Sequence, residues 1–410
     1  MTVERSSVPL ADPPLGTVAG ALLGASWRGA PGTDLAPLVG LAVRDNPRRA
    51  QLVVSLVLAK HVPAPPAEVI AAGERLGRLV RDALGDGEPP LVIGFCETAT
   101  GLGHAVAEEL PGSDVVHSTR REVPGRRPTF AFAEEHSHAV GHLLAPDDPT
   151  LLRCGRPVVL VDDELTSGRT TANIVVALGQ RGPLGRVVIA TLADLRPAAA
   201  RSGPPAVSLL DAELDLPADV ADRAAGARAL PRASVVPPRG RGGVSVLDAA
   251  WPTDLPPSGR GGVSAAERAA VLAAVEGLAD QVQGELPDGR VLVVGTEELV
   301  HVPTRLAAAL AARRGGGVLV QSTTRSPVLA LDRPGYAVRR SVAFPAPDDP
   351  ARLSLLHNVI DPREEMDREP PYSAVVVVTD TPSWSAVGLA EALRPWAALR
   401  VLAVGISGRP

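Results

Sequence analysis

The sequence predicts an α/β fold with a mostly parallel sheet, and it predicts that this unit occurs twice along the chain. Short apolar runs that suit buried strands alternate with stretches whose apolar residues recur at helical spacing, as in a parallel sheet covered by helices. The elements found before residue 200 return in the same order after residue 264, which indicates an internal duplication. One predicted strand ends in adjacent carboxylates and a Thr/Ser/Gly turn, at the end of a parallel strand where α/β sheets bind ligands.

The first copy is a succession of strands and helices. Residues 1–33 mix Pro, Gly and Ala without a period, so we expect them to be loosely ordered. Residues 122–150 are polar and too long for an ordinary connection, which is typical of a lid or a disordered loop. The predicted elements are, in chain order, a strand at 52–58, a helix at 67–84, a strand at 91–94, a helix at 103–110, strands at 114–118 and 158–161, a helix at 171–181, and strands at 186–192 and 207–214.

The second copy follows a segment rich in Pro, Gly and Arg. Chance similarity among αβ units could produce one match between the copies, but four matches in the same order favour duplication. The matching segments are 265–283 with 67–84, 291–298 with 91–97, 319–325 with 115–121, and 375–381 with 158–164. We therefore expect a first domain at 35–215, a linker at 216–263 and a second domain at 264–410.

Length and composition exclude several classes of function. At about 150 residues per domain, 410 residues suggest two or three domains. A net charge of −5 and 2% aromatic residues give neither bulk attraction to nucleic acid nor a platform for stacking bases. Cys96 and Cys154 define no disulfide framework or zinc site. No apolar run reaches the roughly 20 residues of a membrane span, and the first residues lack the layout of a signal peptide, so we expect a soluble cytoplasmic protein.

The acid pair Asp162 and Asp163 directly follows the apolar residues 158–161. Adjacent carboxylates can accept hydrogen bonds from two neighbouring hydroxyls or hold Mg²⁺ through them. The hydroxyl-rich turn after them leads into a helix, and backbone N–H groups at a helix N-terminus cradle phosphate. Together these groups suit a phosphorylated sugar. The alternative is an ordinary strand–turn–helix whose acids cap the helix.

The second copy differs where this chemistry would lie. It has Thr379, Asp380 and Thr381 in place of the acid pair, and Pro382 removes an N–H donor from the following turn. We expect Trp384 to fill the space that a phosphate would need. The second copy is therefore predicted to be degenerate.

The strand, the acid pair and the Thr/Ser-Gly loop resemble the PRPP-binding motif of type I phosphoribosyltransferases. This resemblance implies a Rossmann-like phosphoribosyltransferase fold followed by a degenerate α/β copy of it. It implies that Asp162 and Asp163 hold the ribose hydroxyls of PRPP and, indirectly through PRPP, the cofactor Mg²⁺. The residues implied to bind the 5′-phosphate are Thr166, Ser167, Gly168, Arg169 and Thr170, and those implied to bind pyrophosphate are Cys96, Glu97, Thr98, Ala99 and Thr100.

For other groups expected near the site, a functional role and a purely structural role both remain open. The loop at 95–101 could be an ordinary β–α turn capped by a threonine, and Glu97 is unexpected beside pyrophosphate unless it contacts a metal or the acceptor. The resemblance places catalytic basic groups at Arg120 and Arg121, although an exposed arginine pair is often only solvated surface. It also implies a flexible loop that closes over the site and a hood that recognises the acceptor. The candidates in the loop are Arg127, His136 and His138, which could equally be surface groups, and those in the hood are Arg44–Arg49, Ser55, Lys60 and His61.

A closer resemblance is to the orotate-transferase-like phosphoribosyltransferases of tellurium-resistance (ter) stress operons, which carry a C-terminal TRSP domain. The tetrapeptide that names this domain stands here as Thr324-Arg325-Ser326-Pro327. The resemblance implies a pentosyltransferase that moves phosphoribose from PRPP to a nitrogenous, base-like acceptor, in the making of a nucleoside-like metabolite. We expect a homodimer with no nucleic-acid or membrane partner. The alternatives are a PRPP- or nucleotide-sensing regulator without turnover, and cleavage by pyrophosphate in the reverse direction. The second-domain candidates Thr324, Arg325 and Ser326 could serve a ligand site, a dimer surface or packing alone.

Overall fold

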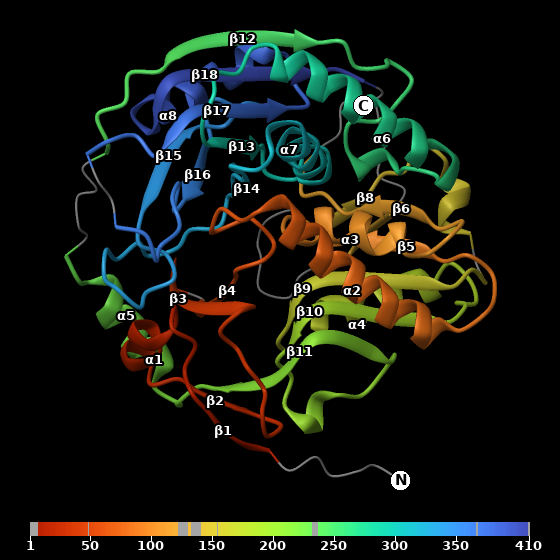
Figure 1. Ribbon diagram of the computed structural model, residues 1–410. Coiled ribbons are helices and arrows are strands. Elements are labelled where there is room, and N and C mark those ends of the chain that lie inside the picture. Colours follow the sequence, from red (N-terminus) through yellow and green to blue (C-terminus); the bar gives the residue numbers. More distant parts are fainter. Residues whose placement is uncertain are drawn as a thin grey trace.

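The computed structural model describes residues 7–47, 49–121, 130–132, 141–153, 155–231, 237–365 and 368–408. Figure 1 shows two sheets, one formed by the N-terminal half of the chain and one by the C-terminal half, with helices packed between and around them. We refer to the two halves as the N-terminal and C-terminal domains. Within the described residues, no helix has the length and apolar character needed to cross a membrane.

The sheet of the N-terminal domain has seven strands in the order β1-β2-β11-β10-β9-β5-β6. The five strands from β11 to β6 are parallel, whereas β2 is antiparallel to both of its neighbours. The strands are β1 (Val8–Leu10), β2 (Ser26–Gly29), β5 (Leu91–Gly94), β6 (Asp114–His117), β9 (Val158–Leu165), β10 (Val187–Asp194) and β11 (Ala206–Asp215). The apolar runs predicted as strands between residues 91 and 214 are thus confirmed, and β9 lies near the centre of the sheet, with its first four residues buried on both faces.

Helices cover this sheet as the apolar spacing predicts. They are α2 (Pro66–Leu84), α3 (Ala99–Glu108) and α4 (Arg169–Gly179). Helix α2 buries Val69, Leu76 and Val80, which recur at helical spacing. It lies close to α3, because a Cβ added to Gly73 would be 2.2 Å from the Cβ of Ala105.

Residues 7–33 are more ordered than their composition suggests. They contain α1 (Thr17–Leu23) in addition to β1 and β2. Leu23 and Trp27 are buried, and the burial of such large apolar side chains stabilises a segment that has little periodicity of its own. Next along the chain, β3 (Val39–Asn46) and β4 (Arg49–Ser55) form a separate antiparallel hairpin.

The sheet of the C-terminal domain has five parallel strands in the order β12-β18-β17-β13-β14. They are β12 (Gly243–Ala249), β13 (Val291–Gly295), β14 (Val318–Ser322), β17 (Tyr372–Thr379) and β18 (Ala397–Ile406). The helices are α6 (Ala265–Gln283), which begins with a Ser264/Glu267 capping box, α7 (His301–Arg314) and α8 (Val387–Leu393). The interval 216–263, expected to be a linker, contains the helix α5 (Val220–Arg228) as well as β12.

The two sheets share one strand order, in which β6, β5, β9 and β10 correspond to β14, β13, β17 and β18. The register agrees as well, since Gly94 pairs with Val161 in the first sheet and Gly295 pairs with Val378 in the second. The edge strands differ in origin, because β11 follows β10 in the chain whereas β12 precedes α6. By this alignment Glu97 is equivalent to Glu298, and Asp163 is equivalent to Asp380.

Each domain also carries a hairpin beyond its edge strand. In the N-terminal domain the hairpin is β7 (Phe130–Phe132) with β8 (His142–Leu144), and in the C-terminal domain it is β15 (Ser341–Pro345) with β16 (Leu353–His357). Thr119 pairs with Leu143 of the first hairpin, and the equivalent Thr324 pairs with Leu355 of the second. Between the two sheets, α7 packs against α2 and α3, so the domains share an interface of helices (Figure 1).

Candidate active site

The acid pair lies at the carboxyl end of β9, as the sequence predicts. The strand continues through Leu165, so Asp162 and Glu164 project to one face of the sheet and Asp163 to the other. The backbone N–H of Asp163 donates a 2.9 Å hydrogen bond to the Asp162 carboxylate. Burial, together with the charge of Asp163, raises the pKa of Asp162 well above its ordinary value. Among the described residues, no cationic side chain forms an ion pair with either aspartate.

The loop after β9 leads into the N-terminus of α4. Gly168 adopts a left-handed conformation with φ of 71°, which a residue with a side chain rarely takes. Its carbonyl accepts a 2.7 Å hydrogen bond from the hydroxyl of Thr171, which fixes the first turn of the helix. Thr166, Ser167 and Arg169 remain exposed. Because the first N–H groups of a helix lack partners within it, this loop can bind an anion.

The loop after β5 lies beside the acid pair, since β5 and β9 are neighbours. Its backbone is held by Ser118, which donates from its N–H to the Gly94 carbonyl at 2.9 Å and accepts from the Cys96 N–H at 3.0 Å. Burial and the nearby Glu298 carboxylate raise the pKa of the Cys96 thiol to about 12. Cys96 is therefore a packing residue that supplies its backbone to the loop, because its thiol stays protonated at neutral pH.

The unexpected acid of this loop, Glu97, is neutralised by groups from both domains. Lys60 Nζ lies 3.2 Å from its carboxylate, the Thr324 hydroxyl donates to it at 2.8 Å, and Arg325 Nε donates at 3.0 Å. Although burial alone would raise the pKa of Glu97, Lys60 and Arg325 lower it to about 2. Lys60 Nζ also donates to the Thr98 hydroxyl at 2.8 Å, so it connects two residues of the loop.

The arginine pair after β6 lies against the C-terminal domain instead of the acid pair. Arg121 forms ion pairs with Glu297 and, at 3.2 Å, with Asp348. The backbone N–H of Arg120 donates to Glu298, and one of its guanidinium nitrogens lies 3.3 Å from His142 Nε2. Sequence reasoning could not find the partners in the C-terminal domain, because they lie more than 170 residues away. The loop candidates Arg127, His136 and His138 lie outside the described residues.

The hairpin β3–β4 carries several of the residues that were expected in the hood. Arg44 lies 4.0 Å from the carboxylate of Glu164 and donates to the Ser326 hydroxyl at 3.2 Å. Burial and the charge of Asp163 raise the pKa of Glu164 to about 7, and the charges of Arg44, Arg49 and Lys60 oppose this rise. Glu164 was not among the predicted site residues. The signal for it was its position directly after the acid pair.

The equivalent place in the C-terminal domain is filled by the chain itself. The guanidinium group of Arg260 lies 2.5 Å from the Asp380 carboxylate and 2.8 Å from that of Glu298. Asp380 thus has a fixed counter-ion, whereas its equivalent Asp163 has none among the described residues. The expectation for Trp384 was wrong, because its side chain is 71% exposed and fills no phosphate site. Instead the turn after Pro382 is tied to Asp248, which accepts from the Ser383 N–H at 3.2 Å.

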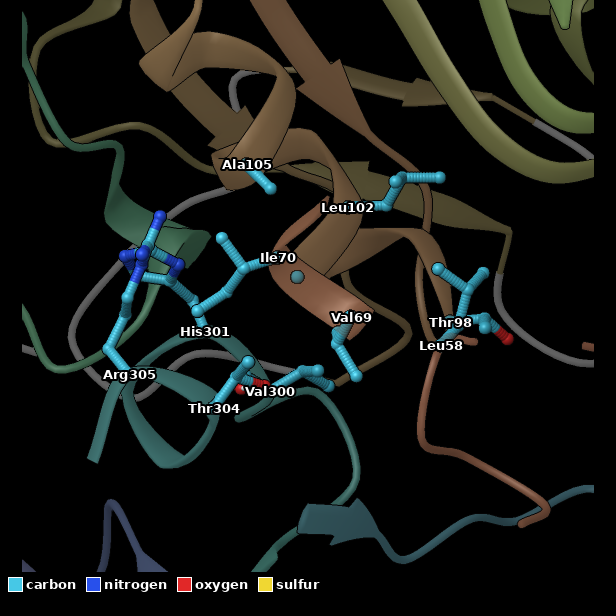
Figure 2. A pocket seen from close by; sticks show the side chains of 11 residues that line it. Leu58, Val69, Ile70, Thr98, Leu102, Ala105, Val300, His301, Thr304 and Arg305 are labelled. Carbon is cyan, nitrogen blue, oxygen red and sulfur yellow. Dashed lines mark hydrogen bonds between the residues drawn. The ribbon is translucent and has the colours of Figure 1, made fainter. Parts of the chain in front are cut away.

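A small pocket lies at the interface between the domains, away from the acid pair. Figure 2 shows its lining from α2, α3 and α7, which includes Val69, Leu102, Ala105 and Thr304. His301 lies at its edge and stacks on His104, with 4.3 Å between ring centroids. Burial lowers the pKa of His301 to about 4, so this stack is uncharged at neutral pH. The rest of the lining is mostly apolar, and its charged member Arg305 is paired with Glu108.

A metal ion would need oxygens from a bound ligand. Within the described part of the chain, no group of three or more His, Cys, Asp or Glu side chains is arranged to hold one. Asp162 and Asp163 provide carboxylates at the end of β9 that have no cationic partner among the described residues. They fit a metal that is shared with the oxygens of a ligand.

Comparisons with known proteins agree with this geometry. Residues 38–227 match the phosphoribosyl transferase family, and residues 257–393 match the TRSP domain found C-terminal to it. The chain is therefore a phosphoribosyltransferase, one of the pentosyltransferases. More particularly, it belongs to those phosphoribosyltransferases whose transferase domain is followed by a TRSP domain. No protein of curated function shows significant sequence similarity to it.

Solved structures of similar proteins include several purine phosphoribosyltransferases. Adenine phosphoribosyltransferase from Rhodothermus marinus is 19% identical over 36% of this chain and 80% of its own, with a TM-score of 0.26. The adenine enzyme from Thermoanaerobacter pseudethanolicus is 20% identical over 36% and 84% of the respective chains, with a TM-score of 0.26. A hypoxanthine-guanine phosphoribosyltransferase from Bacillus anthracis is 14% identical over 37% and 82%, also with a TM-score of 0.26.

Proposed function

We propose that the N-terminal domain transfers phosphoribose from PRPP to a nitrogenous, base-like acceptor and releases pyrophosphate. The observation that carries this proposal is the acid pair at the end of β9. Asp162 and Asp163 are carboxylates without a cationic partner among the described residues, whereas the equivalent Asp380 is neutralised by Arg260. A partly buried carboxylate pair without such a partner favours a ligand that brings hydroxyl donors or a cation.

The chemistry follows from where charge develops. The bond between the anomeric carbon of PRPP and pyrophosphate breaks, a bond to the acceptor nitrogen forms, and the acceptor loses a proton. The sugar passes through an oxocarbenium-like state, as in other glycosyl transfers. Asp162 and Asp163 would hold the ribose hydroxyls, and the loop before α4, with Gly168 at its turn, would hold the 5′-phosphate. The loop after β5 would hold pyrophosphate through its backbone N–H groups.

Mg²⁺ is the cofactor that this arrangement fits. Asp162 and Asp163 would hold it indirectly, through the oxygens of PRPP. When bound, it neutralises charge on the departing pyrophosphate. The motif resemblance also supports a role in making a nucleoside-like metabolite of a ter stress operon. Loss of tellurite tolerance in cells whose only copy is the Asp162→Asn/Asp163→Asn variant would test that role, and light scattering would test the expected homodimer.

The direct test is a pyrophosphate-release assay with PRPP, Mg²⁺ and a panel of bases and carboxylated heterocycles. We expect the Asp162→Asn/Asp163→Asn variant to lose at least 100-fold in rate while keeping its unfolding midpoint. Asp82→Asn, on the exposed side of α2, is the matched control and should be unchanged. Turnover retained by the double variant would contradict the site assignment. PRPP binding without pyrophosphate release for any acceptor would favour the second candidate, a PRPP-sensing regulator.

A further inference from the structure

The two domains contact each other reciprocally. The segment before α2 pairs with the edge of the second sheet, where Ala64 and Val320 exchange backbone hydrogen bonds of 3.0 and 2.9 Å. The segment before α6 does the same at the edge of the first sheet, where Val263 and Val115 exchange bonds of 2.8 and 2.9 Å. Each sheet is thus extended at its edge by a residue from the opposite domain.

The same reciprocity holds for charged groups at the centre of the interface. Glu97 accepts a 2.8 Å hydrogen bond from Thr324, and the equivalent Glu298 accepts a 2.8 Å hydrogen bond from Thr119. The residue after each threonine is an arginine whose backbone N–H points to the same carboxylate. The Thr-Arg pair that follows the edge strand of one domain therefore binds the β–α loop of the other.

All four residues of the tetrapeptide contact the N-terminal domain. Thr324 and Arg325 bind Glu97 in the loop after β5. Ser326 accepts a hydrogen bond from Arg44 on the hood hairpin. The Pro327 carbonyl accepts a 3.0 Å hydrogen bond from the backbone N–H of Asp45 on the same hairpin. The tetrapeptide thus joins the candidate pyrophosphate loop to the candidate acceptor hood.

The two halves of this reciprocal contact differ, because only one of them lies beside carboxylates that have no counter-ion among the described residues. Thr119 and Arg120 reach a place where Arg260 already neutralises both Glu298 and Asp380. Thr324 and Arg325 reach a place where the carboxylates of Asp162 and Asp163 have no fixed counter-ion among the described residues. The contact from the C-terminal domain to the N-terminal domain is therefore the one that can affect a ligand.

We propose that the TRSP tetrapeptide completes the PRPP site of the N-terminal domain, with Arg325 as a positioning residue for the pyrophosphate loop. This inference rests on the proposed function. Arg325 holds the Glu97 carboxylate away from the incoming pyrophosphate and balances its charge jointly with Lys60. Without Arg325, a buried carboxylate in this loop keeps one cationic partner and repels a polyanion. The C-terminal domain, which has lost its own site, thereby serves the other one.

Calorimetric titration of the full chain tests this role with three ligands: PRPP with Mg²⁺, pyrophosphate with Mg²⁺, and ribose 5-phosphate. We expect Arg325→Ala to weaken PRPP and pyrophosphate at least tenfold and to leave ribose 5-phosphate within twofold, because ribose 5-phosphate lacks the group bound by the loop. Arg325→Lys should recover part of the lost affinity, because it restores the positive charge but not the planar guanidinium with its several N–H donors. Arg313→Ala, on the far side of α7 beside Glu276, is the matched control and should bind all three ligands normally.

Two results would overturn the inference while leaving the proposed function intact. One is an affinity of Arg325→Ala for PRPP equal to that of the wild-type chain. The other is an equal loss of affinity for all three ligands, which would indicate general damage to the domain. If Arg325→Ala does not fold, Arg325→Gln is judged by the same criteria, because it keeps a polar side chain at this position and removes the charge that balances Glu97. Failure of the wild-type chain to bind PRPP with Mg²⁺ would instead refute the proposed function, and this inference with it.

Discussion

Glu97 and Glu298 occupy equivalent positions in the two domains, and each accepts a 2.8 Å hydrogen bond from a threonine of the opposite domain. The Glu298 carboxylate is buried and the Glu97 side chain is only 9% exposed, so each carboxylate needs partners, and some of these come from the opposite domain. Lys60 is the contribution of the N-terminal domain to Glu97, and Arg260 is that of the C-terminal domain to Glu298. The interface is therefore ionic at its centre, and three predictions test how it and the neighbouring site are built.

The first prediction concerns the close approach of backbone at the start of the pyrophosphate loop. A Cβ on Gly94 would lie 2.6 Å from the carbonyl oxygen of Ala99, which is backbone and cannot rotate away. We expect Gly94→Ala to lower the free energy of unfolding by about 1–3 kcal/mol and to reduce PRPP binding, because the loop must shift. Urea denaturation measures the first effect and calorimetry the second. Gly87→Ala is the control, since its added Cβ would meet nothing within 4 Å; equal stability of the two variants would contradict the prediction.

The second prediction concerns Glu164, whose pKa is raised to about 7 by burial and by Asp163. The folded chain binds this proton more tightly than the unfolded chain, so the stabilising contribution is complete below pH 4.5 and is lost as the pH rises through 7. Glu164→Gln keeps a neutral side chain at every pH. We therefore expect it to be more stable than wild type by roughly 1–3 kcal/mol at pH 8, since one pKa unit is worth about 1.4 kcal/mol.

Urea denaturation of both chains at pH 4, 6 and 8 measures this effect. The difference in free energy of unfolding between the variant and wild type should be small at pH 4 and should grow toward pH 8. A difference that stays constant from pH 4 to pH 8 would show that Glu164 does not titrate in this range.

The third prediction concerns Glu97, whose pKa moves in the opposite direction. Burial favours its neutral form, but Lys60 and Arg325 lower the pKa to about 2. Its contribution to stability is therefore complete above pH 4.5 and is lost as the pH falls toward 2. We expect Glu97→Gln to lower the free energy of unfolding by about 3 kcal/mol at pH 6, because it leaves the buried Lys60 and the partly buried Arg325 without this partner.

The pH dependence of urea midpoints separates this effect from simple loss of packing. The difference in urea midpoint between wild type and Glu97→Gln should decrease steadily from pH 5 to pH 3. Glu88→Gln, an exposed glutamate before β5, provides the control and should follow wild type throughout. A gap that is as wide at pH 3 as at pH 6 would rule out an ionised Glu97 as its cause.

Much of the fold was predictable because its signals are local. The apolar run before Asp162, the helix that begins near Thr171, and the duplicated strand order all depend on residues close together in sequence, and the structure confirms them. The order of residues 7–33 was not predictable, because it depends on burying side chains such as Leu23 and Trp27 against distant parts of the chain.

The composition of the site was harder to predict than its location. The partners of Glu97 include Arg325, which is 228 residues away, and those of Arg121 include Glu297. A resemblance to a family motif assigns a basic residue to the site of its own domain. The reciprocal packing of two copies exchanges these residues between domains, and nothing in the sequence around Arg121 or Arg325 indicates such an exchange.

The exchanged backbone pairs at Ala64–Val320 and Val263–Val115 have a consequence for solubility. Each covers a sheet edge, at β14 or β6, that would otherwise present free N–H and C=O groups to other molecules. Separated domains would expose both edges and could form non-native strand pairs. Joined in one chain, the two domains keep a high effective concentration of each other. Covalent linkage therefore helps to keep both sheet edges covered, and separation of the domains after a proteolytic cut would expose these edges and also remove Arg325 from Glu97.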